Sequence, residues 1–323
     1  MGISTSPGVW RGLKATSSNS NRFSILAFDQ RGNYRRMLPP DASYETAAQI
    51  KRDVVVALAP YVDAVLLDPI YGLAAALDMP GDTGLLMAIE KTGYAGNPTE
   101  RRVDFMDGWT INKIKRLGAS AVKLLVYYHP EAGTAGEVEE TVRSISAQCR
   151  QYDLPLFVEP LLYSLNDAVP ESSAEFAAQR PELALETARR LGGLGVDVLK
   201  LEFPVDVRHE PDRAVWQRAC EALTEASPVP WVLLSAGVDY DVFREQVEVA
   251  CAAGASGFLG GRAIWKEAIT LSPEERARFL RETAAARLES LREIVERSAR
   301  PWSDYFDSPA ATEDWFLSYQ QMP

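Results

Sequence analysis

The chain has 323 residues, of which 46% are hydrophobic, so it can bury a core of the size found in single-domain α/β barrels. Its formal net charge of −11 argues against a general nucleic-acid binder, which needs clustered Lys and Arg. No apolar run approaches the length of a membrane span, and the start of the chain lacks the apolar core of a signal peptide. We therefore expect a cytoplasmic protein with no membrane partner.

Eight short apolar segments read as strands, and most of them are separated by segments with helical periodicity. The predicted strands are 23–28, 62–67, 85–89, 121–127, 155–158, 197–205, 231–234 and 257–259. The main predicted helices are 43–59, 107–117, 137–152, 175–191, 212–225 and 240–253. This order predicts an α/β fold, a (β/α)8 TIM barrel over residues 23–270. A doubly wound open sheet is the alternative, but no G-x-G-x-x-G opens a helix after the first strand.

Two flanking segments complete the predicted organisation. Residues 1–22 are polar and read as a loose lead-in. Residues 271–323 begin with a capping box at Ser272–Glu275, which opens a long helix, and end in a tail rich in Trp, Tyr and Phe. We expect this C-terminal helical extension to dock on the barrel or on a second subunit, and the chain to form a homo-oligomer. The three cysteines, Cys149, Cys220 and Cys251, lie far apart and read as buried thiols.

Polar residues gather where the predicted strands end. Lys123 and Lys200 lie within strands, and the residues at or just past strand ends are Asp29, Asp68, Glu90, Glu159, Ser235 and Arg262. The C-terminal face of a TIM barrel holds its active site. We therefore expect these side chains to converge on one pocket.

Lys200 is the predicted nucleophile. It shares one face of its strand with Glu202, and lysine is rarely buried unless it is paired or used. Burial lowers the pKa of an ammonium group, and a neutral amine can attack a carbonyl. The plainer interpretation is a buried Lys200–Glu202 ion pair without chemistry. Lys123 is a second candidate nucleophile, and the neighbouring Glu202 favours Lys200 only modestly.

Two glycine-containing turns, Ser235–Gly237 and Gly260–Arg262, close the last two strands, where many barrels bind phosphate. Arg262 can add a bidentate contact to such an anion. A zinc site is disfavoured because the only histidines, His129 and His209, lie in separate segments. Magnesium held by Asp29, Asp68 or Glu90 remains an alternative.

A buried lysine, carboxylates and an anion site together describe Schiff-base chemistry on a phosphorylated ketone, with no metal or cofactor. Glu159, one strand before Lys200, is the carboxyl best placed to accept the proton of the substrate's C4 hydroxyl.

Several motifs, in order, resemble the class I tagatose 1,6-bisphosphate aldolase family over about residues 23–270. They are Ala27–Gly32, Leu67–Gly72, Glu90–Tyr94, Val122–Tyr128, Glu159–Pro160, Val198–Glu202, Leu234–Gly237 and Gly260–Trp265. The resemblance implies cleavage of tagatose 1,6-bisphosphate to dihydroxyacetone phosphate and glyceraldehyde 3-phosphate. It implies that Lys200 forms the Schiff base, that Glu159 is the acid/base, that Asp29, Gln30 and Lys123 contact substrate, and that Ser235, Gly237, Gly261 and Arg262 hold a phosphate.

Two positions depart from the family pattern as we expect it. Ile70 stands where an acidic residue is expected, and the last turn reads Gly260-Gly261-Arg262 where Cys-Gly-Arg is expected. These departures bear on the far end of the substrate, so a sulfofructose-1-phosphate aldolase, which gives sulfolactaldehyde instead, is the alternative. A regulatory barrel with little turnover, or an isomerase without a covalent intermediate, are further alternatives.

Overall fold

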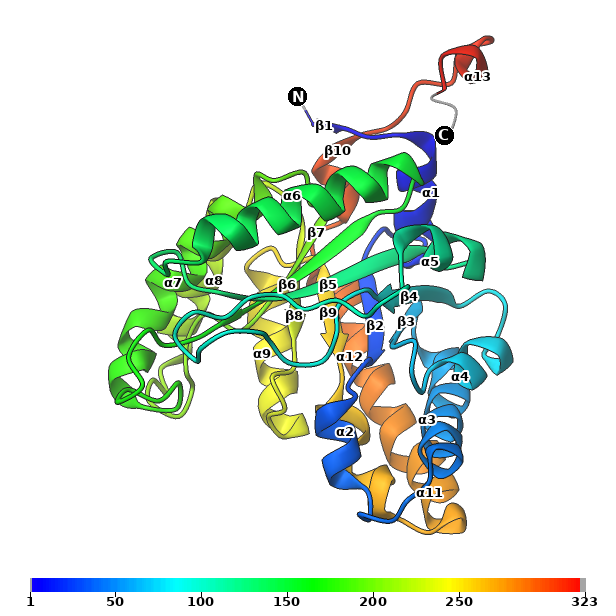
Figure 1. Ribbon diagram of the computed structural model, residues 1–323, viewed down its shortest axis with the longest axis vertical. Coiled ribbons are helices and arrows are strands. Elements are labelled where there is room, and N and C mark those ends of the chain that lie inside the picture. Colours follow the sequence, from blue (N-terminus) through cyan, green and yellow to red (C-terminus); the bar gives the residue numbers. More distant parts are fainter. Residues whose placement is uncertain (1, 320–323) are drawn as a thin grey trace.

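The computed structural model describes residues 2–319, so Met1 and 320–323, the outer ends of the expected lead-in and tail, lie outside the described residues. Eight parallel strands close into a barrel in sequence order (Figure 1). They are β2 (Phe23–Phe28), β3 (Ala64–Leu67), β4 (Gly84–Ala88), β5 (Ala121–Tyr128), β6 (Leu156–Leu162), β7 (Val198–Leu201), β8 (Trp231–Leu234) and β9 (Gly257–Gly260). The prediction of a (β/α)8 barrel is confirmed.

Helices between the strands form the outer layer of the barrel. They are α2 (Gly32–Met37), α3 (Tyr44–Leu58), α4 (Leu73–Asp78), α5 (Ile111–Leu117), α6 (Ala135–Gln151), α7 (Ala174–Gly192), α8 (Arg213–Ala226), α9 (Tyr240–Ala252) and α10 (Arg262–Trp265). Side chains accept a hydrogen bond from the first turn of α3, α5, α7 and α8, at Ser43, Thr110, Ser173 and Asp212. These caps satisfy N–H groups that have no partner within a helix, which explains why the helices begin there.

Successive side chains along each strand point alternately into the barrel and toward the surrounding helices. One apolar cluster, which includes Ile25, Leu66, Phe157 and Val232, consists mainly of inward-facing strand residues, and Phe23 packs edge-on against Phe157 at 5.5 Å between ring centroids. The alternate strand residues, such as Leu26 and Leu233, pack with the helices in a larger cluster. Because the inner layers are apolar, polar side chains at the next inward positions lie at the C-terminal mouth of the barrel.

The expected loose lead-in is instead an ordered closure of the barrel's N-terminal end. Residues Pro7–Ala15 form helix α1, capped by Ser6, and its Leu13 is fully buried in the inner apolar cluster. The helix was missed because its apolar residues are few and find their partners only in the open end of the barrel. Strand β1 (Ile3–Ser4) also pairs with β10 (Phe306–Asp307) at the top of Figure 1.

The C-terminal extension docks on the barrel. The capping box of Ser272 and Glu275 is present and opens α11 (Pro273–Phe279), which continues through a π-helical turn at Leu280–Ala284 into α12 (Ala285–Ser298). Further on, Trp302 is fully buried, packs edge-on against Trp10 of α1 at 4.8 Å between ring centroids, and donates to Ser17. The short helix α13 (Trp315–Ser318) leaves Trp315 and Phe316 exposed.

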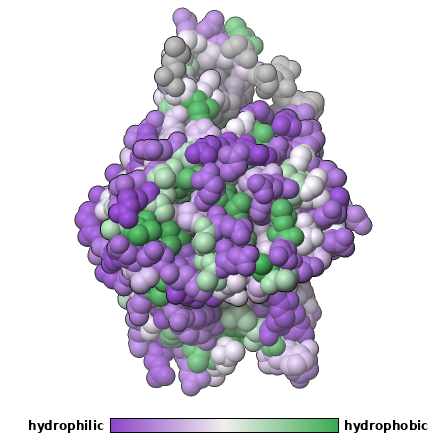
Figure 2. Space-filling view, turned by 90° about the vertical axis from the view of Figure 1, so that its left-hand side faces the viewer, coloured by the Kyte–Doolittle hydropathy of each residue, from purple (hydrophilic) through white to green (hydrophobic). Residues whose placement is uncertain are grey.

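One face of the surface is largely hydrophilic (Figure 2), and the cysteines lie inside the protein. The face shown in Figure 2 is dominated by hydrophilic residues, between which apolar residues occur in small groups. Cys149, Cys220 and Cys251 are free and buried, as predicted. Within residues 2–319, no helix is both long enough and apolar enough to cross a membrane.

Candidate active site

A pocket of about 380 Å³ opens at the C-terminal ends of the strands. All nine residues predicted to act on or bind substrate line it: Asp29, Gln30, Lys123, Glu159, Lys200, Ser235, Gly237, Gly261 and Arg262. They come from, or directly follow, β2, β5, β6, β7, β8 and β9. Parallel strands of a barrel end at the same face, so residues far apart in sequence meet there.

Lys123 lies fully buried at the centre of a cluster of carboxylates. Its Nζ is 2.7 Å from Asp29 Oδ2, 3.1 Å from Glu90 Oε1 and 2.8 Å from Glu159 Oε2. Burial lowers the pKa of Lys123, but the three carboxylates outweigh burial and raise this pKa above its ordinary value. Lys123 is therefore held as an ammonium ion.

Glu159 joins the two lysines of the pocket. Its Oε2 atom lies 2.8 Å from Lys123 Nζ and 2.9 Å from Lys200 Nζ. Both Glu159 and Lys200 are less than 10% exposed, with side-chain exposures of 9% and 3%. Among the described residues, Glu159 is the carboxylate that lies within ion-pair distance of Lys200. Lys200 therefore has fewer carboxylate partners than Lys123.

The alternative of a Lys200–Glu202 ion pair is wrong. Glu202 lines the pocket, but its Oε1 lies 3.3 Å from Arg180 Nη1, and its Oε2 accepts a hydrogen bond from the Leu162 backbone at 3.0 Å. The chain leaves strand β7 after Leu201, so residue 202 no longer follows the strand geometry that would place it beside Lys200. The neighbouring strand supplies the partner of Lys200 instead.

The expectation that Asp68 joins the pocket is also wrong. Strand β3 ends at Leu67, and the turn that follows directs Asp68 Oδ1 to the backbone N–H groups of Ile70 and Tyr71, each at 2.9 Å. The other oxygen of this carboxylate forms a fully buried ion pair with Lys51 of α3. Asp68 therefore organises a turn outside the pocket.

Glu90 and Arg31 complete the charge balance of the pocket. Arg31 Nη2 lies 2.9 Å from Glu90 Oε1, and Glu90 Oε2 accepts from the backbone of Leu125 at 3.0 Å. Burial raises the pKa of Asp29, but Lys123, Lys200 and Arg31 outweigh burial and hold this pKa below its ordinary value. Lys123, Lys200 and Arg31 thus lie against Asp29, Glu90 and Glu159 on one side of the pocket.

The two predicted phosphate turns meet at one side of the pocket. Ser235 Oγ accepts a hydrogen bond from the Gly261 backbone at 3.2 Å, which joins the turn after β8 to the turn after β9. Gly237 has a φ of 82°, and a Cβ atom there would lie 2.8 Å from Arg262 Cζ. Glycine is thus required both by the backbone conformation and by the close approach of the guanidinium group. This corner, with Arg262 half-buried, suits an oxyanion.

The carboxylates proposed as magnesium ligands do not converge on one point. Asp29 and Glu90 both contact Lys123, whereas Asp68 contacts Lys51. Within residues 2–319, no group of three His, Cys, Asp or Glu side chains is arranged to hold a metal ion. His129 and His209 contact backbone groups, the Glu131 N–H and the Ser172 carbonyl respectively.

Neither departure from the expected motifs faces the pocket. Ile70 is 42% exposed and lies on the turn fixed by Asp68, and a Cβ atom at Gly260 would meet Ile264 at 2.6 Å, on the helix side of β9. Arg31 was missed as an active-site residue although it follows Asp29 and Gln30 directly. Its position in the sequence could have identified it, because residues that directly follow the end of a strand also lie at the C-terminal end of the barrel.

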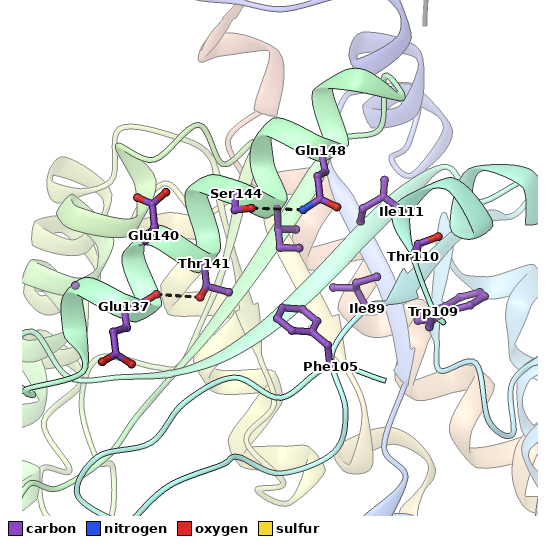
Figure 3. Close-up of a pocket in the computed structure, with 12 residues that line it drawn as sticks. Ile89, Phe105, Trp109, Thr110, Ile111, Glu137, Glu140, Thr141, Ser144 and Gln148 are labelled. Atoms are coloured by element: carbon purple, nitrogen blue, oxygen red, sulfur yellow. Dashed lines mark hydrogen bonds between the residues drawn. The ribbon is translucent and has the colours of Figure 1, made fainter. Parts of the chain in front are cut away.

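A larger cavity of about 830 Å³ lies outside the barrel, between α6 and the segment from β4 to α5. Figure 3 shows Ile89 and Phe105 facing α6, on which Thr141 donates to the Glu137 carbonyl. Its lining combines apolar side chains with the hydroxyl, amide and carboxyl groups of α6, and among residues 2–319 no lysine, histidine or cysteine lines it. The pocket at the strand ends, where Lys123, Glu159 and Lys200 meet, is the candidate active site.

Comparisons with known proteins identify the family of the chain. A family model described as DeoC/LacD family aldolase matches residues 23–267. The tagatose 1,6-diphosphate aldolase of Lactococcus lactis subsp. lactis is 34% identical, covering 91% of this chain and 97% of the relative. Tagatose 1,6-diphosphate aldolases of Streptococcus agalactiae (33% identical, 90% and 96% coverage) and Staphylococcus aureus (34%, 90% and 96%) are also similar.

Solved aldolase structures share the fold. A Schiff-base-forming fructose-1,6-bisphosphate aldolase superposes with a TM-score of 0.59 at 22% identity, covering 89% of this chain and 99% of that one. The fructose-bisphosphate aldolase of Plasmodium falciparum gives a TM-score of 0.66 at 14% identity, covering 93% and 98%. The family match spans most of the chain, and three curated relatives exceed 30% identity over nine-tenths of it, so the chain belongs to the DeoC/LacD family of aldolases.

Proposed function

We propose that this aldolase is a class I, metal-independent enzyme in which Lys200 forms a Schiff base with a ketose 1,6-bisphosphate and Glu159 moves the protons. The observation that carries the proposal is the position of Glu159 Oε2, 2.8 Å from Lys123 Nζ and 2.9 Å from Lys200 Nζ. This carboxylate can take a proton from Lys200 while Lys123 keeps the local charge balanced. A nucleophile within hydrogen-bond reach of its base is the arrangement that covalent catalysis requires.

The same contacts support Lys200 over Lys123 as the nucleophile. Three carboxylates hold Lys123 as an ammonium ion, and an ammonium ion has no lone pair for attack. Lys123 is better suited to orient Asp29 and Glu159 and to contact a substrate hydroxyl. Asp29 Oδ1 and Gln30 Oε1 are buried without a hydrogen-bond partner in the described residues, and both line the pocket, so they suit the same task.

The proposed reaction breaks the C3–C4 bond of the substrate through an iminium ion and an enamine. The Lys200 amine, whose extra proton has passed to Glu159, adds to the C2 carbonyl. Glu159 returns that proton to the carbinolamine hydroxyl, which leaves as water and gives the iminium ion. Glu159 then accepts the C4 hydroxyl proton, the C3–C4 bond breaks, and its electron pair enters the iminium to form an enamine as the aldehyde leaves. Protonation of the enamine at C3 and hydrolysis of the iminium release dihydroxyacetone phosphate and restore the Lys200 amine.

The substrate we propose is tagatose 1,6-bisphosphate, which gives dihydroxyacetone phosphate and glyceraldehyde 3-phosphate. The relatives named above are all tagatose 1,6-diphosphate aldolases. Ser235, Gly237, Gly261 and Arg262 would hold the phosphate of the dihydroxyacetone-phosphate half. The two motif departures that raised the sulfofructose-1-phosphate alternative lie away from the pocket lining, so they give that alternative no support.

Cleavage in the presence of EDTA tests the proposal. Tagatose 1,6-bisphosphate, fructose 1,6-bisphosphate and sulfofructose 1-phosphate should be compared by following the release of dihydroxyacetone phosphate. We expect tagatose 1,6-bisphosphate to be cleaved with EDTA present, at a kcat/KM at least about ten times that of the sulfonate, a difference of about 1.4 kcal/mol. A reversed preference would establish the sulfofructose reading, and complete loss of activity in EDTA would overturn the metal-independent mechanism.

We also infer that the enzyme works in the cytoplasm as a homo-oligomer. Tyr44, Ile70, Leu73 and Leu77 are 54%, 42%, 48% and 72% exposed and lie on α3, α4 and the turn before α4, which supports a subunit contact. Light scattering of the purified protein should give more than one chain per particle. A monomer at micromolar concentration would remove this part of the proposal.

A further inference from the structure

A second fully buried lysine, Lys51, lies outside the pocket on helix α3. Its Nζ donates to the Phe28 carbonyl at 2.6 Å and to the Gln30 carbonyl at 3.1 Å, and it forms an ion pair with Asp68. These two carbonyls flank Asp29. Lys51 does not line the pocket, so it can affect substrate only through the residues that it holds.

The ion pair connects the ends of two neighbouring strands. Asp68 fixes the turn after β3 through the Ile70 and Tyr71 N–H groups, while Lys51 fixes the end of β2. The Lys51 ammonium group also lies 4.4 Å from the centroid of the Phe28 ring. A single buried cation therefore sets the position of the backbone from which Asp29 and Gln30 project.

A second side chain holds the same strand end from outside the barrel. Trp265 of α10 donates through Nε1 to the Ala27 carbonyl at 3.0 Å, and its ring stacks on Phe28 at 3.9 Å. The carbonyls of residues 27, 28 and 30 are thus all bound from the helix side. On the pocket side, Asp29 Oδ2 contacts Lys123 at 2.7 Å. Asp29 is located by contacts on both sides of the strand.

A purely stabilising role explains this arrangement poorly. Removing an ammonium and a carboxylate from water costs more than their attraction commonly returns, and apolar replacements of buried ion pairs are often neutral or stabilising. The Lys51–Asp68 pair is 0% exposed on both sides. Burial of this pair is better explained if Lys51 serves to fix the positions of the two carbonyls around Asp29.

We propose that Lys51 is a positioning residue of the aldolase, which fixes Asp29 and Gln30 so that they meet the substrate and keep Lys123 in place beside Glu159. The inference rests on the proposed function of the pocket. Loss of Lys51 should lower turnover at each competent site, and should leave phosphate binding by the turns after β8 and β9 intact, because those turns do not contact Lys51.

Arg276 of α11 offers a matched control. It is also buried, with 7% of its side chain exposed, and it also binds two carbonyls and a carboxylate of α3. Its partners are the Ala268 and Leu271 carbonyls, each at 3.0 Å, and Asp53 at 3.1 Å. None of these residues lines the active-site pocket. Arg276→Met therefore removes a comparable set of buried hydrogen bonds and leaves the strand end that carries Asp29 unchanged.

The experiment compares wild type, Lys51→Met and Arg276→Met. Borohydride reduction of one sample with dihydroxyacetone phosphate counts the sites that form an iminium. For an untreated sample, kcat for tagatose 1,6-bisphosphate is then expressed per trapped site, and KM is measured alongside. For Lys51→Met we expect kcat per site to fall roughly 10- to 100-fold, the size of effect that a small misplacement of catalytic groups produces. KM should change less than about threefold, because phosphate binding supplies uniform affinity. Arg276→Met should have at most fewer sites that trap dihydroxyacetone phosphate. Its kcat per trapped site and its KM should equal those of wild type.

The outcomes separate the two proposals. A wild type that forms no adduct contradicts the proposed function itself. Adduct formation by wild type, with wild-type kcat per trapped site in Lys51→Met, overturns the positioning role and leaves Lys51 a structural residue. If Lys51→Met does not fold, Lys51→Gln, whose amide can still bind one carbonyl, decides instead. A fall in kcat per site in Lys51→Gln supports the proposal, and a wild-type kcat per site overturns it.

Discussion

At the scale of single residues, the pocket distinguishes two lysines that are alike in sequence. Lys123 and Lys200 both lie within strands among apolar neighbours, yet Lys123 contacts three carboxylates and Lys200 contacts Glu159. Charge therefore fixes the protonation of one lysine and leaves the other beside a proton acceptor. This difference is the physical basis for assigning Lys200 the attack on the carbonyl and Lys123 the orientation of its neighbours.

Gly237→Ala should weaken phosphate binding. The residue has a φ of 82°, and its new Cβ would lie 2.8 Å from Arg262 Cζ, so the guanidinium must move. We expect KM for tagatose 1,6-bisphosphate to rise about tenfold or more, the loss of one good charged contact, with a smaller change in kcat.

Gly118→Ala is the matched control for backbone strain. Gly118 also has a left-handed conformation, with a φ of 91°, but a Cβ there would meet no atom within 4 Å. Both variants should lose about 1 kcal/mol of unfolding free energy, measured by urea titration. An unchanged KM in Gly237→Ala, or an equal rise in Gly118→Ala, would contradict the assigned phosphate corner.

At the scale of elements, aspartates just before two strands hold the N-terminal end of the barrel. Asp63, before β3, accepts from the Ser24 backbone of β2 at 3.0 Å and lies 3.2 Å from Arg292 of α12. Asp197, before β7, accepts from the Leu156 backbone of β6 at 2.8 Å. Each carboxylate satisfies an N–H group where a neighbouring strand begins. This end of the barrel therefore serves stability, whereas the opposite end serves chemistry.

Asp63 gives the barrel a defined pH dependence. Burial raises the pKa of Asp63 to about 6, against the lowering effects of Arg292 and the Ser24 N–H, and its side chain is 5% exposed. Because the folded pKa lies above the unfolded value of about 3.9, ionisation disfavours the fold. This cost is absent below about pH 4, grows between about pH 4 and 6, and is constant above that.

The unfolding free energy of Asp63→Asn relative to wild type should therefore rise by roughly 3 kcal/mol between about pH 4 and pH 7, since two pKa units correspond to about 1.4 kcal/mol each. Chemical denaturation at each pH measures this slope. Asp104→Asn is the control, and its unfolding free energy relative to wild type should fall as the pH rises. The reason is that a hydrogen bond from Lys91 lowers the pKa of the exposed Asp104. A flat or falling difference for Asp63→Asn would show that Asp63 ionises in the fold as easily as in the unfolded chain.

At the scale of the whole molecule, the sequence was sufficient to predict the barrel and the residues that meet at its mouth. Alternation and strand order place Lys123, Glu159 and Lys200 at one face, because parallel strands in a barrel end together. The partner of Lys200 was not predictable in this way. The alternation of residues along a strand predicts which face of the sheet a side chain lies on. The ion pair between Lys200 and Glu159 depends in addition on the stagger between β6 and β7 and on where each strand ends.

Two other features depended on tertiary contacts that no local pattern records. Helix α1 has a local start signal in its Ser6 cap and Pro7, but its short apolar side, with Leu13, is buried only by the open end of the barrel. The ion pair of Lys51 and Asp68 joins a helix to a turn, so neither residue alone signals it. Local periodicity predicts elements well, but it does not predict which buried charges will meet.

The central claim is that Lys200 forms an iminium ion with dihydroxyacetone phosphate. The most direct test is borohydride reduction in the presence of dihydroxyacetone phosphate and EDTA, followed by peptide mass mapping of wild type, Lys200→Ala and Lys123→Ala. We predict a reduced adduct on the peptide that contains Lys200, its loss in Lys200→Ala, and residual trapping in Lys123→Ala. An adduct that persists in Lys200→Ala and disappears in Lys123→Ala would reverse the two lysines, and no adduct on any lysine would contradict the Schiff-base mechanism.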